Sequence, residues 1–281
     1  MSITQYTDQQ FFGFLENSSK MFTKLGLKLS AITVNEIVHT MQNQIPKIDR
    51  TKITALFHDL QDSIDVEFCK ISTHHKNIFC LLQSDYRISL KIYPQVVNQV
   101  FNMNNKVDKL ERRINIYRNL EILRSAVMRN NPSIEEKFVG LSYAYLGIVD
   151  GLYKLSLQEC YVWHKIAKNE PIHMKNILDS SPAEIYNHFL QEKINLSYFD
   201  GWDRTVRNSV GHSSFKYDNV KQQMTYENYD RKTGNYNTID YTYDQLGENY
   251  YKLEAIYHAV LAITHISMVN DSSRVLCDRY P

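Results

Sequence analysis

Three residues with complementary chemistry stand close together in the stretch RNSVGH: Arg207, Asn208 and His212. An arginine offers a planar fork of N–H donors that fits a phosphate, and a neutral histidine accepts a proton near pH 7. An asparagine can orient a hydroxyl group or the imidazole ring. These groups suffice to cleave RNA without a metal: the histidine takes the proton of a 2′-hydroxyl, whose oxygen attacks the adjacent phosphorus, and the arginine stabilises the charge that gathers on the phosphoryl oxygens.

A structural interpretation of the same stretch competes with the catalytic one. Asp203 precedes Arg207 by four residues, the spacing of ion pairs on a helix surface, and Asp200 and Arg204 share that spacing. Each such pair contributes about 0.3 to 0.5 kcal/mol to helix stability. Gly211 then ends the helix, and the histidine just beyond it interacts favourably with the helix dipole. In the catalytic interpretation, Asp203 and Arg204 instead support the site.

RNSVGH resembles the signature of the HEPN superfamily, in which an arginine and a polar residue are followed by three residues and a histidine. The context is similar too, because FDGWDRTVRNSVGH is followed by an extended insertion and a final apolar helix. The resemblance covers roughly residues 133–270. It implies a helical bundle acting as a ribonuclease of the toxin, phage-defence or CRISPR-associated kind, with Arg207 and His212 catalytic and Asn208 supporting them.

The resemblance also implies a homodimer, because two copies of the domain usually face one cleft in this superfamily. Helix geometry gives a separate reason to expect it. Residues five apart on a regular helix point about 140° away from each other, so Arg207 and His212 converge poorly unless the chain turns back after Gly211. The expected partners are therefore RNA, a second copy of the chain and a regulatory or antitoxin protein.

Helix signals dominate the sequence around the motif. Ser133 and Glu136 form a capping box that opens a long helix, and Ser181, Pro182 and Glu184 open a short helix that ends near residue 194. We expect the motif helix to start near residue 199 and Asp244 to cap the last helix. The long helix carries an apolar seam, which forms either the bundle core or a contact between two copies: Phe138, Leu141, Tyr145, Ile148, Leu152 and Leu155.

Two arms rich in tyrosine and threonine, VKQQMTYENY and NYNTIDYTY, flank the segment DRKTG. Their alternation with polar residues predicts a β-hairpin before the last helix. The tyrosines either pack on a sheet face or stack on unpaired RNA bases. In the second case, Arg231 and Lys232 at the turn are candidate RNA-binding residues.

The predicted fold is mainly α: a helical bundle with a β-hairpin insertion before the last helix, preceded by an all-α N-terminal domain. RNNPS, at residues 129–133, breaks the helical pattern and marks the domain boundary. Residues 1–130 form a helical domain with a regulatory or partner-binding role, and residues 131–281 form the HEPN-like bundle. Within the first domain we expect helices at 33–45, from 49 past 69, and from 94 to about 128.

Charge and composition limit the classes of function. The 281 residues carry a formal net charge of +1, which excludes a polyanion binder that works through bulk charge. The four cysteines lie far apart, as is typical of free thiols in a reducing compartment. No leader peptide or membrane-spanning run stands out. We expect a cytoplasmic protein that does not contact a membrane.

One further cluster contains metal-ligand residue types: Cys69, His74, His75 and Cys80. Its spacing matches no established zinc pattern, so a helical core and its edge explain it better. No glycine loop that cradles phosphates accompanies the motif. We therefore expect no metal and no cofactor.

Overall fold

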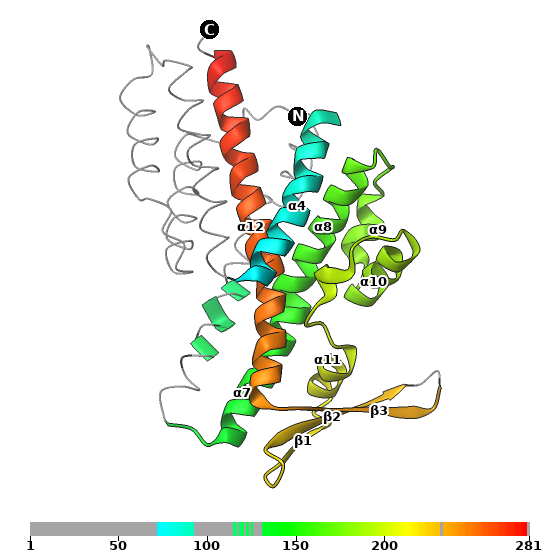
Figure 1. Cartoon of the computed structure of the whole chain (residues 1–281), viewed down its shortest axis with the longest axis vertical. Coiled ribbons are helices and arrows are strands. Elements are labelled where there is room, and N and C mark those ends of the chain that lie inside the picture. Colours follow the sequence, from blue (N-terminus) through cyan, green and yellow to red (C-terminus); the bar gives the residue numbers. More distant parts are fainter. Residues whose placement is uncertain are drawn as a thin grey trace. The chain divides into compact units, whose positions relative to one another are not determined.

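The computed structural model describes residues 72–92, residues 115–116, 118–120, 122–123 and 125, and residues 131–230 and 233–279. The chain forms two compact units, one made of residues 1–102 and 261–281 and the other of residues 103–260. The fold is mainly helical, with a small antiparallel sheet before the last helix, as predicted (Figure 1).

In the first unit the structure describes the helix α4 (Thr73–Ile92). His75 of this helix is buried. Its burial and, to a smaller extent, the charge of the neighbouring His74 lower the pKa of His75 to about 4. The helix expected at 33–45, residues 49–69 of the one expected from 49 past 69, and most of the one from 94 lie outside the described residues. The boundary at 129–133 stays a prediction.

The long helix of the second unit consists of α7 (Ile134–Ile148), the π-helical turn η2 (Val149–Tyr153) and α8 (Lys154–Ala167). The predicted capping box of Ser133 and Glu136 opens it. The seam residues Phe138, Tyr145, Ile148 and Leu152 are buried within the single chain. They form bundle core, so this seam does not provide the contact between two copies.

The π-turn moves the seam by one residue. Because a π-turn closes hydrogen bonds over five residues instead of four, it shifts the register of everything that follows. Leu155, which the regular spacing places in the core, is only partly buried. Its neighbours Ser156 and Leu157 are fully buried instead. Leu155 therefore lies at the edge of the core, as the seam residue Leu141 does before the turn.

Shorter helices lead from α8 to the motif: α9 (Met174–Asp179), α10 (Pro182–Gln191), the 3-10 helix η3 (Leu196–Phe199) and α11 (Arg204–Gly211). The predicted capping box of Ser181 and Glu184 is present, with Pro182 in the first turn of α10. The motif helix begins at Arg204 and not near Phe199, which belongs to η3. Asp200 therefore lies outside α11, and the helical spacing expected between Asp200 and Arg204 does not hold.

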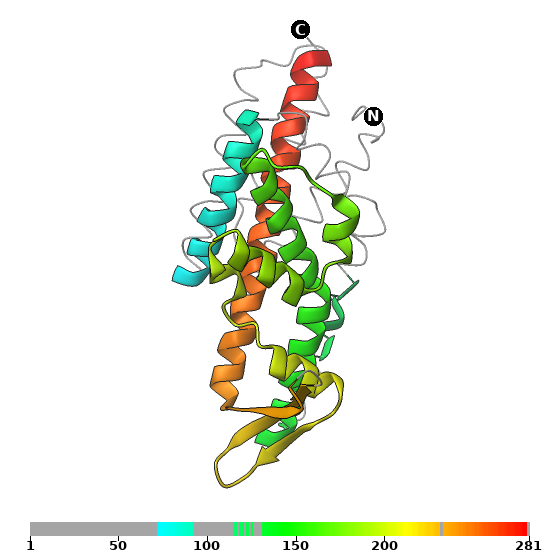
Figure 2. The same cartoon turned by 90° about the vertical axis from the view of Figure 1, so that its right-hand side faces the viewer.

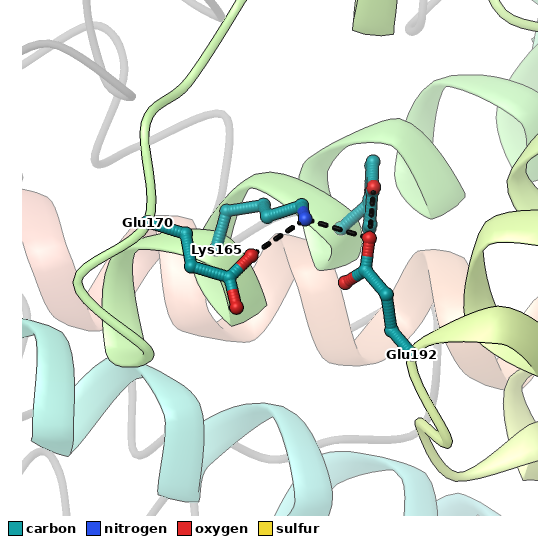
Figure 3. A network of polar contacts seen from close by, with 4 residues as sticks. Lys165, Glu170 and Glu192 are labelled. Carbon is teal, nitrogen blue, oxygen red and sulfur yellow. Dashed lines mark hydrogen bonds and ion pairs between the residues drawn. The ribbon is translucent and has the colours of Figure 1, made fainter.

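A polar network joins the end of α8 to the end of α10 (Figure 3). Lys165 Nζ lies 2.6 Å from both Glu170 Oε2 and Glu192 Oε1, and Tyr161 Oη donates to Glu192 Oε1 at 2.8 Å. Burial would lower the pKa of Lys165, but its two carboxylate partners raise it above the usual value. Burial would raise the pKa of Glu192, but the bonds from Lys165 and Tyr161 lower it below the usual value.

We expect Glu192→Gln to lower the free energy of unfolding at pH 7 by about 2 kcal/mol, because it removes a charge-assisted acceptor from a side chain that is 22% exposed. The folded pKa of Glu192 is depressed, so the contribution is present above the unfolded value of about 4.3 and is lost as the pH falls through the folded value. Urea unfolding from pH 7 to pH 3 measures it. The wild type should lose more stability over that range than Glu192→Gln, and parallel curves would contradict the prediction. Glu170→Gln, at a side chain 39% exposed, is the control and should have a smaller effect.

The sheet has three antiparallel strands in the order β1 (Phe215–Asp218), β2 (Gln223–Asp230) and β3 (Asn235–Tyr241). β2 and β3 are the predicted hairpin, with Tyr229 opposite Tyr236. β1 is an additional strand. The inner face carries the buried Met224 and Tyr226, and Tyr226 Oη lies 2.7 Å from Ser142 Oγ of α7. α11 contacts both α7 and β2, and both views show it beside the strands (Figure 1 and Figure 2).

The last helix, α12 (Tyr243–Arg279), follows β3 directly. Its cap is Thr242, not Asp244: Gln245 N donates to Thr242 Oγ1 and Thr242 N donates to Gln245 Oε1. The threonine succeeds because it lies outside the helix, where a cap residue must be, whereas Asp244 is already in the first turn. Among the described residues, no helix has the length and apolar character needed to span a bilayer.

Candidate active site

A tight turn delivers the chain from η3 into α11. Gly201 adopts a left-handed conformation with φ of 86°, and a Cβ there would lie 2.4 Å from Asn249 O, so only glycine fits. Tyr145 of α7 fixes the turn from the other side. Its hydroxyl donates to Gly201 O at 2.8 Å and accepts from Asp203 N at 2.7 Å. Burial raises the pKa of Tyr145 well above its usual value, so this hydroxyl stays protonated.

Asp203 caps α11. Its Oδ1 accepts from Thr205 N at 2.7 Å and Val206 N at 3.1 Å, and its Oδ2 accepts from Tyr241 Oη at 3.0 Å. These bonds occupy the carboxylate, so the ion pair expected between Asp203 and Arg207 does not form between these two described residues. Asp203 thus supports the site by starting its helix.

Arg207 is held by two acceptors from different parts of the chain. Its Nε and Nη2 donate to the two carboxylate oxygens of Asp150 at 2.9 and 3.0 Å, a bidentate pair. Its Nη1 donates to Asn208 Oδ1 at 3.0 Å. A guanidinium has five N–H donors, and contacts with the described residues use three of them. Two donors, one on each terminal nitrogen, remain for a phosphate.

Asp150 was not predicted as a site residue. It lies in the π-turn, where the extra residue turns it outward while its neighbours Val149, Gly151 and Leu152 are buried. Such turns occur often at functional sites. The signal in the sequence is weak: an acid beside an apolar seam and next to a glycine.

His212 is the C-cap residue of α11, and its side chain is exposed. Ser214 N donates to Ser209 O at 2.8 Å and Ser213 N to Val210 O at 3.1 Å, which together make a Schellman motif. The left-handed residue of this motif is Ser213, with φ of 56°. Gly211 is the last residue of the helix, as predicted, but the chain turns two residues later. His212 therefore stands on a firmly bonded backbone with its ring in solvent.

The bond between Asp150 and Arg207 orients the guanidinium more than it stabilises the fold. Both side chains are well exposed, at 45% and 42%, and a pair of this kind contributes no more than about 1 kcal/mol. A bidentate contact nevertheless restricts a side chain that otherwise samples many rotamers. The main effect of the pair is therefore to fix the orientation of the Arg207 guanidinium.

We expect Asp150→Asn to leave the melting temperature nearly unchanged and to lower the kcat of RNA cleavage about tenfold, because Arg207 loses its fixed orientation. KM for RNA should fall as well, since a negative charge beside Arg207 that repels the RNA is gone. Steady-state kinetics on one short RNA separates the two effects. Glu135→Gln is the matched control, because it removes one exposed charge from α7 away from Arg207. Equal kcat values for both variants would contradict a positioning role.

The structure describes some of the remaining predicted site residues and not others. Arg204 is exposed at the start of α11, and Arg231 and Lys232 lie outside the described residues. The hairpin tyrosines divide into two groups. Tyr226 is buried core, whereas Tyr229 and Tyr236 are 51% and 70% exposed with ring centroids 5.1 Å apart.

Cys80 and Cys160 form no disulfide within the part of the chain that the structure describes, and Cys69 of the cysteine and histidine cluster lies outside the described residues. In comparisons with known proteins, no family model matches the chain, and neither a curated protein nor a solved structure matches it. Function is therefore inferred from the contacts of Arg207, Asn208 and His212.

Proposed function

We propose that the protein is a metal-independent endoribonuclease that uses the 2′-hydroxyl of its own substrate as nucleophile. One observation carries the proposal. An exposed His212 ends the same helix from which Arg207 presents two donors that bond to none of the described residues, in an orientation fixed by Asp150 and Asn208. The chemistry of RNA cleavage needs a base and a phosphate-binding cation near each other, and this helix end supplies both.

Each group has a role in the reaction. The unprotonated imidazole of His212 takes the proton of the 2′-hydroxyl, and the oxygen forms a bond to the adjacent phosphorus. The bond from phosphorus to the 5′-oxygen breaks, and that oxygen leaves with a proton from an acid. The donors of Arg207 stabilise the additional charge on the phosphoryl oxygens. Asn208 holds the guanidinium in place.

The protein acts as a homodimer in this proposal. Cleavage needs both a base and an acid, and two copies of the motif across a twofold axis supply two histidines to one phosphate. The resemblance to HEPN proteins favours the same arrangement. The contact between copies must use a surface other than the buried seam of α7 and η2.

The resemblance also suggests the biological setting. A HEPN-like nuclease of this kind acts in the cytoplasm as a toxin or antiviral defence effector, restrained by a regulatory or antitoxin protein. Residues 1–130 are the candidate segment for that control. The reaction needs no cofactor, because the nucleophile belongs to the RNA.

The bidentate pair favours a second candidate function. Asp150 and Arg207 join η2 to α11, which is what a helical scaffold or a non-catalytic binding module also requires. In a binding module the motif contacts phosphate without turnover. Cleavage separates the nuclease from both alternatives.

We expect the purified protein to cut total RNA in excess EDTA and to leave 2′,3′-cyclic phosphate and 5′-hydroxyl ends, while DNA of the same length stays intact. Electrophoresis and end labelling read out both properties. Activity that is lost in EDTA and restored by Mg²⁺, or products with 5′-phosphates, would identify a different nuclease mechanism. Binding without cleavage would favour the non-catalytic module.

A further inference from the structure

The loop that carries His212 is closed by hydrogen bonds between Ser209 and Ser214. Ser214 N donates to Ser209 O at 2.8 Å, and in return Ser209 Oγ donates to Ser214 O at 2.6 Å. Ser214 Oγ also lies 3.3 Å from Ser209 O. Because main-chain and side-chain bonds join the two residues in both directions, the backbone between them has little freedom.

The same two serines attach this loop to the sheet. Glu227 N of β2 is 3.0 Å from Ser214 O and 3.1 Å from Ser209 Oγ, so one N–H is shared between two acceptors. Ser214 Oγ donates to Glu227 O at 2.7 Å. The end of α11 and the strand β2 are therefore held together at the base of the loop.

Ser209 is fully buried, so its hydroxyl does not contact RNA. Its neighbours in the motif, Arg207 and His212, are both accessible. Ser213, next to the histidine, has the left-handed conformation that residues with a side chain rarely adopt. Such a conformation persists only where surrounding bonds impose it. The backbone bonds of the Schellman motif hold it here, and the Ser209 hydroxyl adds bonds to Ser214 O and from Glu227 N next to this turn.

We propose that Ser209 is a positioning residue that sets where the ring of His212 stands relative to Arg207. The inference rests on the proposed function, because it concerns the same site. A reacting group displaced by about 1 Å loses about a hundredfold in rate. An exposed histidine on a turn depends on its backbone for that accuracy. Ser209 is the one hydroxyl in RNSVGH, and its bonds join the loop to both α11 and β2.

Amide hydrogen exchange tests the positioning without reference to activity. The N–H groups of His212, Ser213 and Ser214 each donate to a carbonyl of α11, so their exchange reports opening of the loop. Ser209→Ala should speed exchange at these three amides about tenfold, equal to about 1.4 kcal/mol. Ser142→Ala is the control, because Ser142 is equally buried and also bonds across elements, to Tyr226. It should leave the three amides unchanged. Unchanged exchange in Ser209→Ala would overturn the proposal.

Kinetics tests the consequence for the reaction. Ser209→Ala should lower kcat about tenfold with KM unchanged, since the substrate contacts stay and only the geometry is relaxed. Ser142→Ala should cleave at the wild-type rate. Faster exchange with an unaltered kcat would refute a role for Ser209 in positioning the base. If the wild type itself fails to cut RNA, the proposed function fails, while the exchange result still decides whether Ser209 holds the loop.

Discussion

Replacing His212 with alanine is expected to lower the rate of RNA cleavage by about a hundredfold to ten-thousandfold, the usual contribution of a general acid or base. The fold should be unaffected, because the ring is exposed and the bonds that hold this turn come from the backbone and from the side chains of Ser209 and Ser214. Single-turnover kinetics on a labelled RNA measures the rate, and circular dichroism with thermal melting verifies the fold.

His173→Ala is the matched control for this variant. His173 is also exposed and also flanks a helix, as the N-cap residue of α9, without a side-chain hydrogen bond to the helix. Its removal should leave cleavage unchanged. Wild-type activity in His212→Ala would show that another group is the base. An equal loss of activity in both variants would show that the loss does not depend on the position of His212.

Replacing Arg207 with alanine is expected to lower kcat by about a hundredfold to a thousandfold, the usual effect of removing one group that stabilises charge in the transition state. Arg207→Lys should recover little of the activity, because a lysine keeps the charge but lacks the fork that pairs with Asp150 and that, in the proposed function, also contacts a phosphate. Both variants should lose no more than about 1 kcal/mol of stability, since the pair is exposed. Full activity of Arg207→Lys would show that only charge is needed.

The two inactive variants together report whether the site is shared between copies. In a mixed dimer of Arg207→Ala with His212→Ala, one composite site regains an intact arginine from one copy and an intact histidine from the other. Subunit exchange should then restore only part of the cleavage rate, because this site has a base but lacks the second histidine that serves as the acid. Two self-sufficient sites would remain inactive in every mixture, and a wild type that cleaves RNA as a monomer would rule out the shared site.

Local signals in the sequence predicted local structure well. The capping boxes at Ser133 and Ser181 depend only on residues within one turn of each other, and both are present. The alternation of β2 and β3 depends on one face being buried, and Tyr226 is buried on that face. β1 was missed, because a strand as short as Phe215–Asp218 carries too few residues to show a pattern.

The contacts of the candidate site depended on tertiary structure and were less predictable. The spacing allows Asp203 either to pair with Arg207 or to cap the helix. The cap forms because the backbone N–H groups at the start of the helix need an acceptor. Arg207 then pairs with Asp150, whose exposure results from the π-turn. Nothing in the spacing of an α-helix predicts that turn. The left-handed residue after α11 is Ser213, because the bonds of the Schellman motif fall there.

In the proposed mechanism, the 2′-hydroxyl of the RNA is the nucleophile, and His212 activates it. The most direct measurement uses a short RNA with one mapped cleavage site and a matched oligonucleotide in which the nucleotide 5′ to the scissile phosphate has a 2′-deoxyribose. The wild type in excess EDTA should cut the first at the mapped position and leave the second intact there. Cleavage of the 2′-deoxy position at a similar rate would contradict the mechanism, because the attacking oxygen would then have to come from water.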